Sequence, residues 1–125
     1  MYGRTSTSVA FIGPPVAALA LFGDKVRARQ LAMSTGVPVV PGSQTAMRDG
    51  NEAAAFVASG TDGVCYPIML KASGGGGGRG MRVVNTADEM VSSFDACSRE
   101  AEAAFGDPTI FVEMLIERAR HVTMK

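Results

Sequence analysis

Residues 71–82 read Lys-Ala-Ser-Gly-Gly-Gly-Gly-Gly-Arg-Gly-Met-Arg, with a run of glycines between two short apolar stretches, residues 67–70 and 81–84. Glycine loses more backbone entropy on folding than any other residue, so a glycine run is a poor way to build a stable turn. Its bare N–H groups, however, suit the close approach of anionic oxygens. Lys71, Arg79 and Arg82 add positive charge around the run. We therefore predict a β-hairpin whose mobile, glycine-rich tip closes over phosphate groups.

Three alternatives to this hairpin can be weighed from the sequence. Glycine-rich segments often serve as flexible linkers, but linkers rarely have strand-like apolar flanks and bracketing cations. The P-loop motif requires Lys-Ser or Lys-Thr after its last glycine, whereas Met81 follows Gly80 here. The spacing G-x-G-x-x-G fits Gly75, Gly77 and Gly80, but the dinucleotide-binding fold needs a helix directly after that motif. Residues 81–84 resemble a strand instead.

The composition limits the class of protein. A length of 125 residues allows one domain or part of a larger one, and a hydrophobic content of 46% is enough for a core. Twelve basic and 12 acidic residues balance, so nothing indicates a nucleic-acid or membrane partner. Cys65 and Cys97 are too few for a disulfide framework or a metal site, which favours an intracellular compartment. No apolar run approaches the roughly 18 residues of a membrane-spanning helix, and residues 1–8 do not resemble a signal peptide.

The first half of the chain is punctuated by Gly, Pro and Asp. Asp24 is placed to cap a helix, and Gly36 is placed to end it. Residues that precede a proline avoid the helical region, so the segment before Pro41 should be extended. The expected elements are a strand at residues 9–12, helices at 16–22, 25–35 and 52–59, an extended segment at 37–41 and an exposed connection at 43–50.

The second half carries the clearest helix signal. Thr86 and Glu89 have the spacing of a capping box, in which each side chain satisfies a free N–H group of the other residue. The helix that follows should bury one apolar stripe, Met90, Phe94, Cys97, Ala101 and Phe105. Residues 109–116 form a nearly continuous apolar run that is typical of a buried strand, and residues 121–125 alternate like a further strand.

Glu113 lies inside the apolar strand, where a carboxylate needs a partner. Ligand donors could be that partner, and so could a nearby arginine. Lys71 lies within the strand before the glycine run, and an unpaired buried ammonium is equally unfavourable. It could contact phosphates, or it could pair with a carboxylate such as Glu113. Strands that interleave with helices in this way favour an α+β fold, a small antiparallel sheet with helices on one face, preceded by a helical connector.

The glycine-rich stretch resembles the lid of ATP-grasp enzymes, in particular the biotin carboxylase component of biotin-dependent carboxylases. The resemblance covers nearly the whole chain, and its finer features are most like pyruvate carboxylase. Besides the lid, it rests on short blocks that recur in the same order: Phe11-Ile12-Gly13-Pro14, Gly23-Asp24-Lys25-Val26, Gly36-Val37-Pro38-Val39-Val40-Pro41-Gly42, Tyr66-Pro67-Ile68 and Arg120-His121.

The resemblance implies an ATP-dependent ligase. Members of this family use MgATP to phosphorylate bicarbonate, and the carboxyphosphate so formed delivers CO2 to biotin, which a carrier domain presents. The intact enzyme is expected to be a homo-oligomer in the cytoplasm or the mitochondrial matrix. The resemblance also implies a division into residues 1–42 (the last strand of a preceding domain and connecting helices), 43–116 (the lid subdomain) and 117–125 (the truncated start of the following subdomain).

The resemblance also implies an ATP site. Lys25 and Lys71 would contact the phosphates, Gly77 and Gly78 would lie over them, and His121 would lie near the ribose. Glu113, Met114, Leu115 and Ile116 would line the adenine pocket, with backbone groups reading the purine edge. Met81 is also assigned to the ATP site. Without the resemblance, Lys25 would count as a solvated side chain and His121 as a structural histidine.

The chain also departs from the family. Met114 stands where members usually carry a lysine, and residues 122–125 replace a more acidic pattern. The family's magnesium ligands, its bicarbonate-binding arginine and its general base have no counterpart here, so we expect no catalytic or metal-binding residue in this chain and no activity from the chain alone. The alternatives are a fragment of another ATP-grasp ligase, of the carbamoyl-phosphate or purine-pathway type, or a non-catalytic nucleotide-binding or interaction module.

Overall fold

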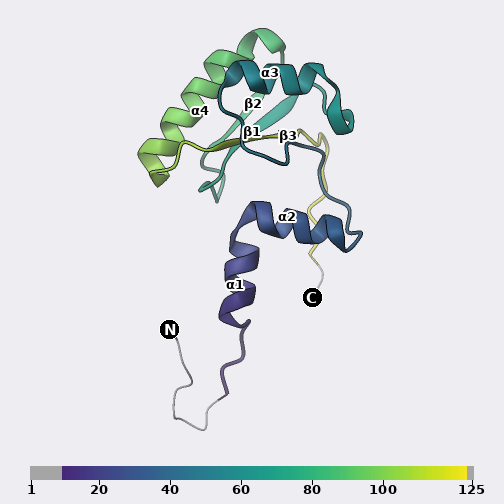
Figure 1. Cartoon of the computed structure of the whole chain (residues 1–125), viewed down its shortest axis with the longest axis vertical. Helices are drawn as coiled ribbons and strands as arrows, with labels where there is room; N and C mark the ends of the chain where they lie inside the picture. The colour runs from purple at the N-terminus through teal and green to yellow at the C-terminus, as the bar shows by residue number, and fades with distance from the viewer. Residues whose placement is uncertain (1–9, 124–125) are drawn as a thin grey trace. The chain divides into compact units, whose positions relative to one another are not determined.

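The computed structural model describes residues 10–123, and the chain divides into two compact units, residues 1–39 and 40–125. Within the first unit lie α1 (Val16–Gly23) and α2 (Lys25–Ser34) (Figure 1). The Asp24 carboxylate accepts hydrogen bonds from the N–H groups of Val26 (2.9 Å) and Arg27 (3.1 Å), which satisfies two of the free donors at the start of α2. Gly36 takes a positive φ of 76° just after this helix. Both predicted helices and the predicted cap are confirmed.

The predicted strand at residues 9–12 is not observed. Residues 10–12 have no regular structure, and the side chains of Phe11 and Ile12 are 85% and 99% exposed. Val9 lies outside the described residues. A strand is stabilised by hydrogen bonds to a neighbouring strand, and none of the strands in the described part of the chain pairs with residues 10–12. The apolar pattern alone could not show that the partner was missing.

The second unit is a small antiparallel sheet covered by helices. Its strands have the order β2-β1-β3, and β1 pairs antiparallel with both neighbours. Helix α4 lies across the sheet and α3 packs beside α4 (Figure 1). The elements are α3 (Gly50–Ala58), the 3-10 turn η1 (Thr61–Gly63), β1 (Ile68–Ala72), β2 (Met81–Val84), the 3-10 turn η2 (Ala87–Glu89), α4 (Met90–Phe105) and β3 (Ile110–Met114). The α+β fold class is confirmed.

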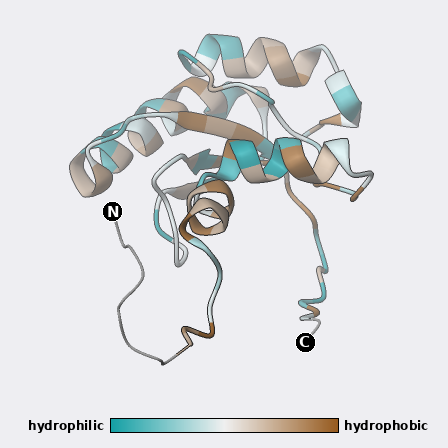
Figure 2. Ribbon diagram, turned by 60° about the horizontal axis from the view of Figure 1, so that its bottom comes forward, coloured by the Kyte–Doolittle hydropathy of each residue, from teal (hydrophilic) through white to brown (hydrophobic). Residues whose placement is uncertain are grey.

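The core lies between the helices and one face of the sheet. Alternate residues of each strand point toward the helices, and those on β1 and β3 are buried: Ile68, Leu70, Ala72, Ile110 and Val112. The apolar stripe of α4 meets them as predicted, with Met90, Phe94, Cys97 and Ala101 buried and Phe105 partly buried. The exposed side of α4 is largely polar, whereas the exposed residues of α3 are Asn51, Ala55 and Ala58. Hydrophilic and hydrophobic segments alternate along the helices in Figure 2. Burial also raises the pKa of the Cys97 thiol.

The segment at residues 43–50 is not simply an exposed connection, as the sequence predicted. Ser43 is 5% exposed; its N–H donates to the Val112 carbonyl (2.8 Å) and its Oγ accepts from the Val112 N–H (3.1 Å). Gly42 and Met47 also pair with residues of β3. The segment therefore covers the outer edge of β3, which satisfies backbone groups that a bare edge strand would leave open.

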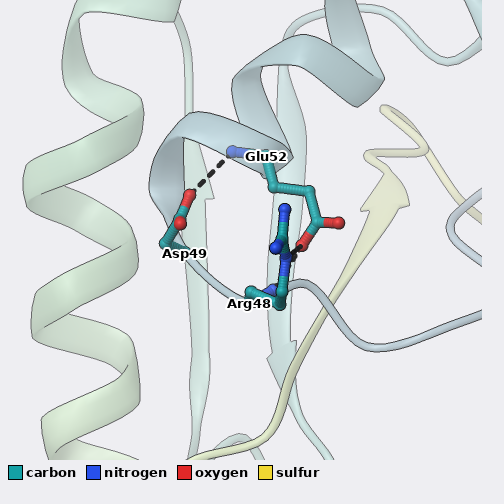
Figure 3. Close-up of polar contacts among 3 residues, drawn as sticks. All are labelled: Arg48, Asp49 and Glu52. Carbon is teal, nitrogen blue, oxygen red and sulfur yellow. Dashed lines mark hydrogen bonds and ion pairs between the residues drawn. The ribbon is translucent and has the colours of Figure 1, made fainter.

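The two helix starts differ from the sequence prediction. Helix α3 begins two residues earlier than expected, because the Asp49 carboxylate accepts from the Glu52 N–H (2.8 Å) and caps the helix (Figure 3). At the other start, the predicted capping box is not formed. The Thr86 hydroxyl makes no capping hydrogen bond, and the Glu89 carboxylate accepts from the Asn85 N–H (3.1 Å) rather than from the Thr86 N–H. The 3-10 turn η2 lies between Thr86 and α4, and moves the helix start to Met90.

The predicted strand at residues 121–125 is also not observed. Residues 121–123 are exposed and irregular, and residues 124–125 lie outside the described part. Arg118 has a positive φ of 55°, which turns the chain after β3. The alternating pattern of this segment has no strand beside it in the described structure, as for residues 10–12.

Candidate functional site

The glycine-rich stretch forms the predicted hairpin connection between β1 and β2. The register places Lys71 opposite Met81, and the Ala72 N–H donates to the Gly80 carbonyl (2.7 Å), which closes the base of the loop. Within the loop, the Arg79 N–H donates to the Gly76 carbonyl (3.1 Å). The hairpin is therefore a defined turn held by backbone hydrogen bonds at its base, rather than a linker without structure.

The tip of the hairpin consists of Gly76, Gly77 and Gly78. A Cβ atom added to any of these three would meet nothing within 4 Å. Gly77 and Gly78 have φ values of 60° and 85°, a conformation that glycine adopts without strain. The tip thus presents backbone to solvent with no side chain in the way, as close contact with anionic oxygens requires.

The face of the sheet that points away from α4 is only half-buried. The register places Met69, Val83 and Glu113 in one row across the three strands. A second row contains Lys71, Met81 and Phe111. We call these six residues the open face; Met81 and Val83 are 43% and 41% exposed. Three of the residues predicted to bind ATP share this face: Lys71 and Met81 form the pair nearest the loop, and Glu113 lies in the other row.

Lys71 and Glu113 form an ion pair diagonally across the open face. The Lys71 Nζ lies 2.5 Å from the Glu113 Oε2, and the two side chains are 33% and 25% exposed. The sequence left open whether Lys71 and Glu113 bind a ligand or a charged side chain; in the structure they pair with each other. Both charges remain partly accessible to water, so a ligand on the open face could still approach them.

The cations around the glycine run do not all face it. Arg82 lies opposite Leu70 on the helix-covered side of the sheet, and its Nη2 bonds the Glu100 Oε1 of α4 at 2.5 Å. Its predicted contribution to the charge around the glycine run is therefore wrong, because the alternation of side chains along β2 directs it away from the open face. Arg79 is exposed in the loop, with its guanidinium 6.0 Å from the centre of the Phe105 ring.

The segment after Glu113 runs along the edge of the sheet. The Met114 N–H donates to the Pro41 carbonyl (2.8 Å) and the Leu115 N–H to the Pro67 carbonyl (3.3 Å). The N–H groups of Met114 and Leu115 are therefore already engaged, and a purine could form hydrogen bonds only with other backbone groups of this segment. The Met114 side chain shares a row with Ile68, on the helix side of the sheet, and Ile116 is 50% exposed.

The two remaining predicted site residues lie away from the hairpin in sequence. Lys25 is the first residue of α2, in the first unit. His121 is exposed in the irregular segment that follows the turn at Arg118. Within the second unit, Lys71, Met81, Gly77 and Gly78 belong to one hairpin, and Glu113 lies on the neighbouring strand β3.

Residues 10–123 contain no group of three or more His, Cys, Asp or Glu side chains placed to hold a metal ion. A magnesium ion requires carboxylates arranged around it, usually together with phosphate oxygens and water. The described residues do not fit such a site by themselves. In the same range, no helix has the length and apolar character needed to cross a membrane.

Residues 24–125 match the family model for the ATP-binding domain of the carbamoyl-phosphate synthase L chain. The chain belongs to this family. It is 44% identical to the biotin carboxylase of Nostoc sp., over 91% of this chain and 25% of that protein. It is 45% identical to the mitochondrial pyruvate carboxylase of Rattus norvegicus, over 94% of this chain and 10% of that protein.

A solved structure has the same fold. The biotin carboxylase domain of Hydrogenobacter thermophilus 2-oxoglutarate carboxylase, a dimer in complex with MgADP, ADP and bicarbonate, aligns with a TM-score of 0.75 and 39% identity. The alignment covers 86% of this chain and 23% of that one. The chain thus spans no more than a quarter of each of these proteins. The predicted resemblance to biotin carboxylase and pyruvate carboxylase is confirmed.

Sequence reasoning missed some features around the hairpin. It placed Phe105 on the core stripe but not beside the loop, and it did not anticipate that the segment at Gly42–Ser43 would cover β3. The sequence could have shown where the Arg82 side chain points, because Arg82 and Val84 are two positions apart on one strand and so share a face, and Val84 is buried. No local pattern indicates the contact of Phe105 with the loop, because that contact joins residues about 30 positions apart.

Proposed function

We propose that this chain is part of a biotin carboxylase, to which it contributes the nucleotide-binding lid. The observation that carries the proposal is the hairpin of β1 and β2, whose bare glycine tip lies at the end of a face that carries Lys71 and Glu113. Loop backbone donors that are unobstructed by side chains stabilise phosphate oxygens. An ATP phosphate chain under the tip would be neutralised by the Lys71 ammonium, which can exchange its bond to Glu113 for a bond to phosphate.

The other residues assigned to ATP complete the proposed site. The segment Glu113–Ile116 would line the adenine pocket, Met81 would also belong to the ATP site, and Gly77 and Gly78 would cover the phosphates. Lys25 and His121 would approach the nucleotide from outside the hairpin. We propose the lid as residues 43–116, with 1–42 belonging to the preceding connection and 117–125 to the following subdomain.

In the intact protein, the proposed reaction is ATP-dependent carboxylation of biotin by bicarbonate through carboxyphosphate. The Hydrogenobacter relative is described with MgADP and bicarbonate, which supports these ligands. The magnesium ion would be held by residues outside those described here, so this chain's own part is to bind and cover the nucleotide. The expected partners are a biotin carrier domain and a second copy of the enzyme, in the cytoplasm or the mitochondrial matrix; the rat relative is mitochondrial.

A second candidate is an ATP-grasp ligase of the carbamoyl-phosphate type. The name of the matching family favours it, and bicarbonate activation by ATP is common to both reactions. The similar proteins and the structural match favour biotin as the acceptor. The two proposals differ in the acceptor and share the role of the hairpin.

A chimaera tests the proposed function. The 114-residue segment of the Nostoc biotin carboxylase that aligns with this chain would be replaced by the corresponding residues of this chain. We expect ATP hydrolysis that requires both bicarbonate and biotin. Loss of this activity in a chimaera that folds would contradict the role of the chain as the nucleotide-binding lid.

The Lys71→Met variant tests the phosphate contact in the same chimaera. It keeps the length and apolar stem of the side chain and removes the ammonium. Loss of one charge-assisted contact should weaken ATP binding by about 1.5–3 kcal/mol, while the affinity for adenosine should be unchanged. Equal loss for ATP and adenosine would contradict a phosphate contact, and unchanged binding of both would remove Lys71 from the site.

A further inference from the structure

The glycines of the hairpin fall into two groups with different surroundings. A Cβ added at Gly76, Gly77 or Gly78 would meet open space. A Cβ added at Gly74 would lie 3.0 Å from the Phe105 Cβ, and one added at Gly80 would lie 3.0 Å from the Phe105 Cε2. The first and last glycines of the loop are therefore in contact with one aromatic side chain, whereas the tip is free.

Phe105 occupies the last position of α4 and is anchored on its other side. It packs against the core cluster that includes Ala72 and Ala101. Its ring also lies 6.0 Å from the Arg79 guanidinium, near the outer limit of a cation–π contact. The ring thus contacts the start of the loop at Gly74, its end at Gly80 and its one charged side chain.

The turn after α4 adds a second tether to the same end of the loop. The Ser73 N–H donates to the Thr109 carbonyl at 2.9 Å. The Asp107 carboxylate accepts from the Thr109 N–H at 3.0 Å. Ser73, which precedes Gly74, is therefore fixed to the connection between α4 and β3.

We propose that Phe105 is a positioning residue that clamps the base of the glycine hairpin and so sets the direction in which its tip meets a nucleotide phosphate. The phosphate part of this inference rests on the proposed function. Gly74 and Gly80 are then required for close packing against the ring. Gly76, Gly77 and Gly78 are left for the ligand. Without this contact the loop would sample more orientations. Ordering it on ATP binding would cost free energy and so weaken the affinity for ATP.

Two measurements on the 125-residue chain test the clamp. Trypsin cleavage after Arg79 under native conditions reports local opening of the loop, and cleavage after the exposed Arg120 serves as an internal standard. The affinities for ATP and adenosine are compared because only ATP carries phosphates, so their difference reports the effect of the clamp on phosphate binding. Phe105→Leu removes the ring, Phe105→Tyr restores it, and Phe94→Leu is the matched control, since Phe94 is a buried residue of the same helix.

We expect Phe105→Leu to raise the cleavage rate after Arg79, relative to Arg120, by about tenfold, with Phe105→Tyr close to wild type. Phe94→Leu should lower global stability without changing this ratio. Affinity for ATP should fall several-fold in Phe105→Leu while affinity for adenosine is retained. Gly80→Ala would push the loop against Phe105 and Ala72, in addition to the strain of its positive φ of 69°, and should act like Phe105→Leu. Gly77→Ala is the matched control, because it carries a similar strain (φ of 60°) but meets open space, and it should raise cleavage by less.

Equal cleavage ratios in Phe105→Leu and Phe94→Leu would overturn the clamp. A raised ratio without selective loss of ATP affinity would overturn the positioning role. If the wild-type chain binds no ATP, the proposed function fails for this chain, while the cleavage ratios still decide whether Phe105 holds the loop. Gly80→Ala supplies the cleavage test if Phe105→Leu does not fold.

Discussion

Lys71 and Glu113 are the residues at which structure and proposed function meet most closely. Their ion pair is 2.5 Å long, and their side chains are 33% and 25% exposed. Partly exposed pairs contribute little to stability because water screens both charges. In a double-mutant cycle with Lys71→Met and Glu113→Gln, we expect a coupling energy of about 1 kcal/mol in the free energy of unfolding, measured by urea denaturation.

The size of this coupling separates two roles for the pair. A coupling of several kcal/mol, with unchanged ATP affinity in the folded protein, would make the pair a structural one and would contradict the phosphate contact. A small coupling together with selective loss of ATP affinity in Lys71→Met agrees with a lysine that changes partner when the nucleotide binds.

The lowered pKa of Asp107 predicts how its contribution to the stability of the fold changes at acid pH. Hydrogen bonds from the side chain and the N–H of Thr109, and from the Ser73 side chain, lower the pKa of Asp107 below its ordinary value of 3.8. A lowered pKa in the folded state stabilises the fold above the unfolded-state value, and this stability is lost as the pH falls through the folded-state value. We expect Asp107→Ala to be less stable than wild type near about pH 6 and the difference to shrink below about pH 3.8. A difference that grew on acidification would contradict these hydrogen bonds.

At the scale of elements, α3 depends on one capping residue. The Asp49 carboxylate accepts from the Glu52 N–H, and the Glu52 carboxylate accepts from the Arg48 N–H at 2.6 Å (Figure 3). Asp49→Ala should lower the free energy of unfolding by about 1 kcal/mol, and Asp49→Asn, which keeps an acceptor oxygen, should lower it by less. Equal losses in the two variants would indicate that the carboxylate acts through its charge rather than as an acceptor. The ion pair of Arg48 with Glu52 is exposed and should add little.

The elements that the sequence predicted correctly are those whose signals are local. Strand β2 has the predicted bounds, Met81–Val84, and the stripe of α4 was read from its helical spacing. The segments at residues 10–12 and 121–123 were predicted as strands and are irregular. Their patterns are those of strands, but a strand also needs a partner, and pairing is a non-local property that apolar spacing does not reveal.

At the scale of the whole molecule, alternation along the strands predicts more of the site than any single motif. Once the hairpin is placed, the period of two puts Lys71 and Met81 on one face and Arg82 on the other. The sequence could not show that Phe105 meets Gly74 and Gly80, because α4 and the loop come together only when the core packs. The sequence offered Glu113 as one of two possible partners of Lys71, and the structure shows their hydrogen bond, between strands 42 positions apart.

Backbone amide chemical shifts of the isotopically labelled chain, followed during titration with ATP and separately with adenosine, test whether the hairpin binds nucleotide phosphates. We expect ATP to shift the amides of Gly76, Gly77 and Gly78 and those of the open face around Lys71, while the outer side of α3 is unaffected. Adenosine should leave the three tip glycines unchanged, because it carries no phosphate. Shifts confined to other surfaces, or tip shifts that are equal for ATP and adenosine, would contradict a hairpin that binds nucleotide phosphates.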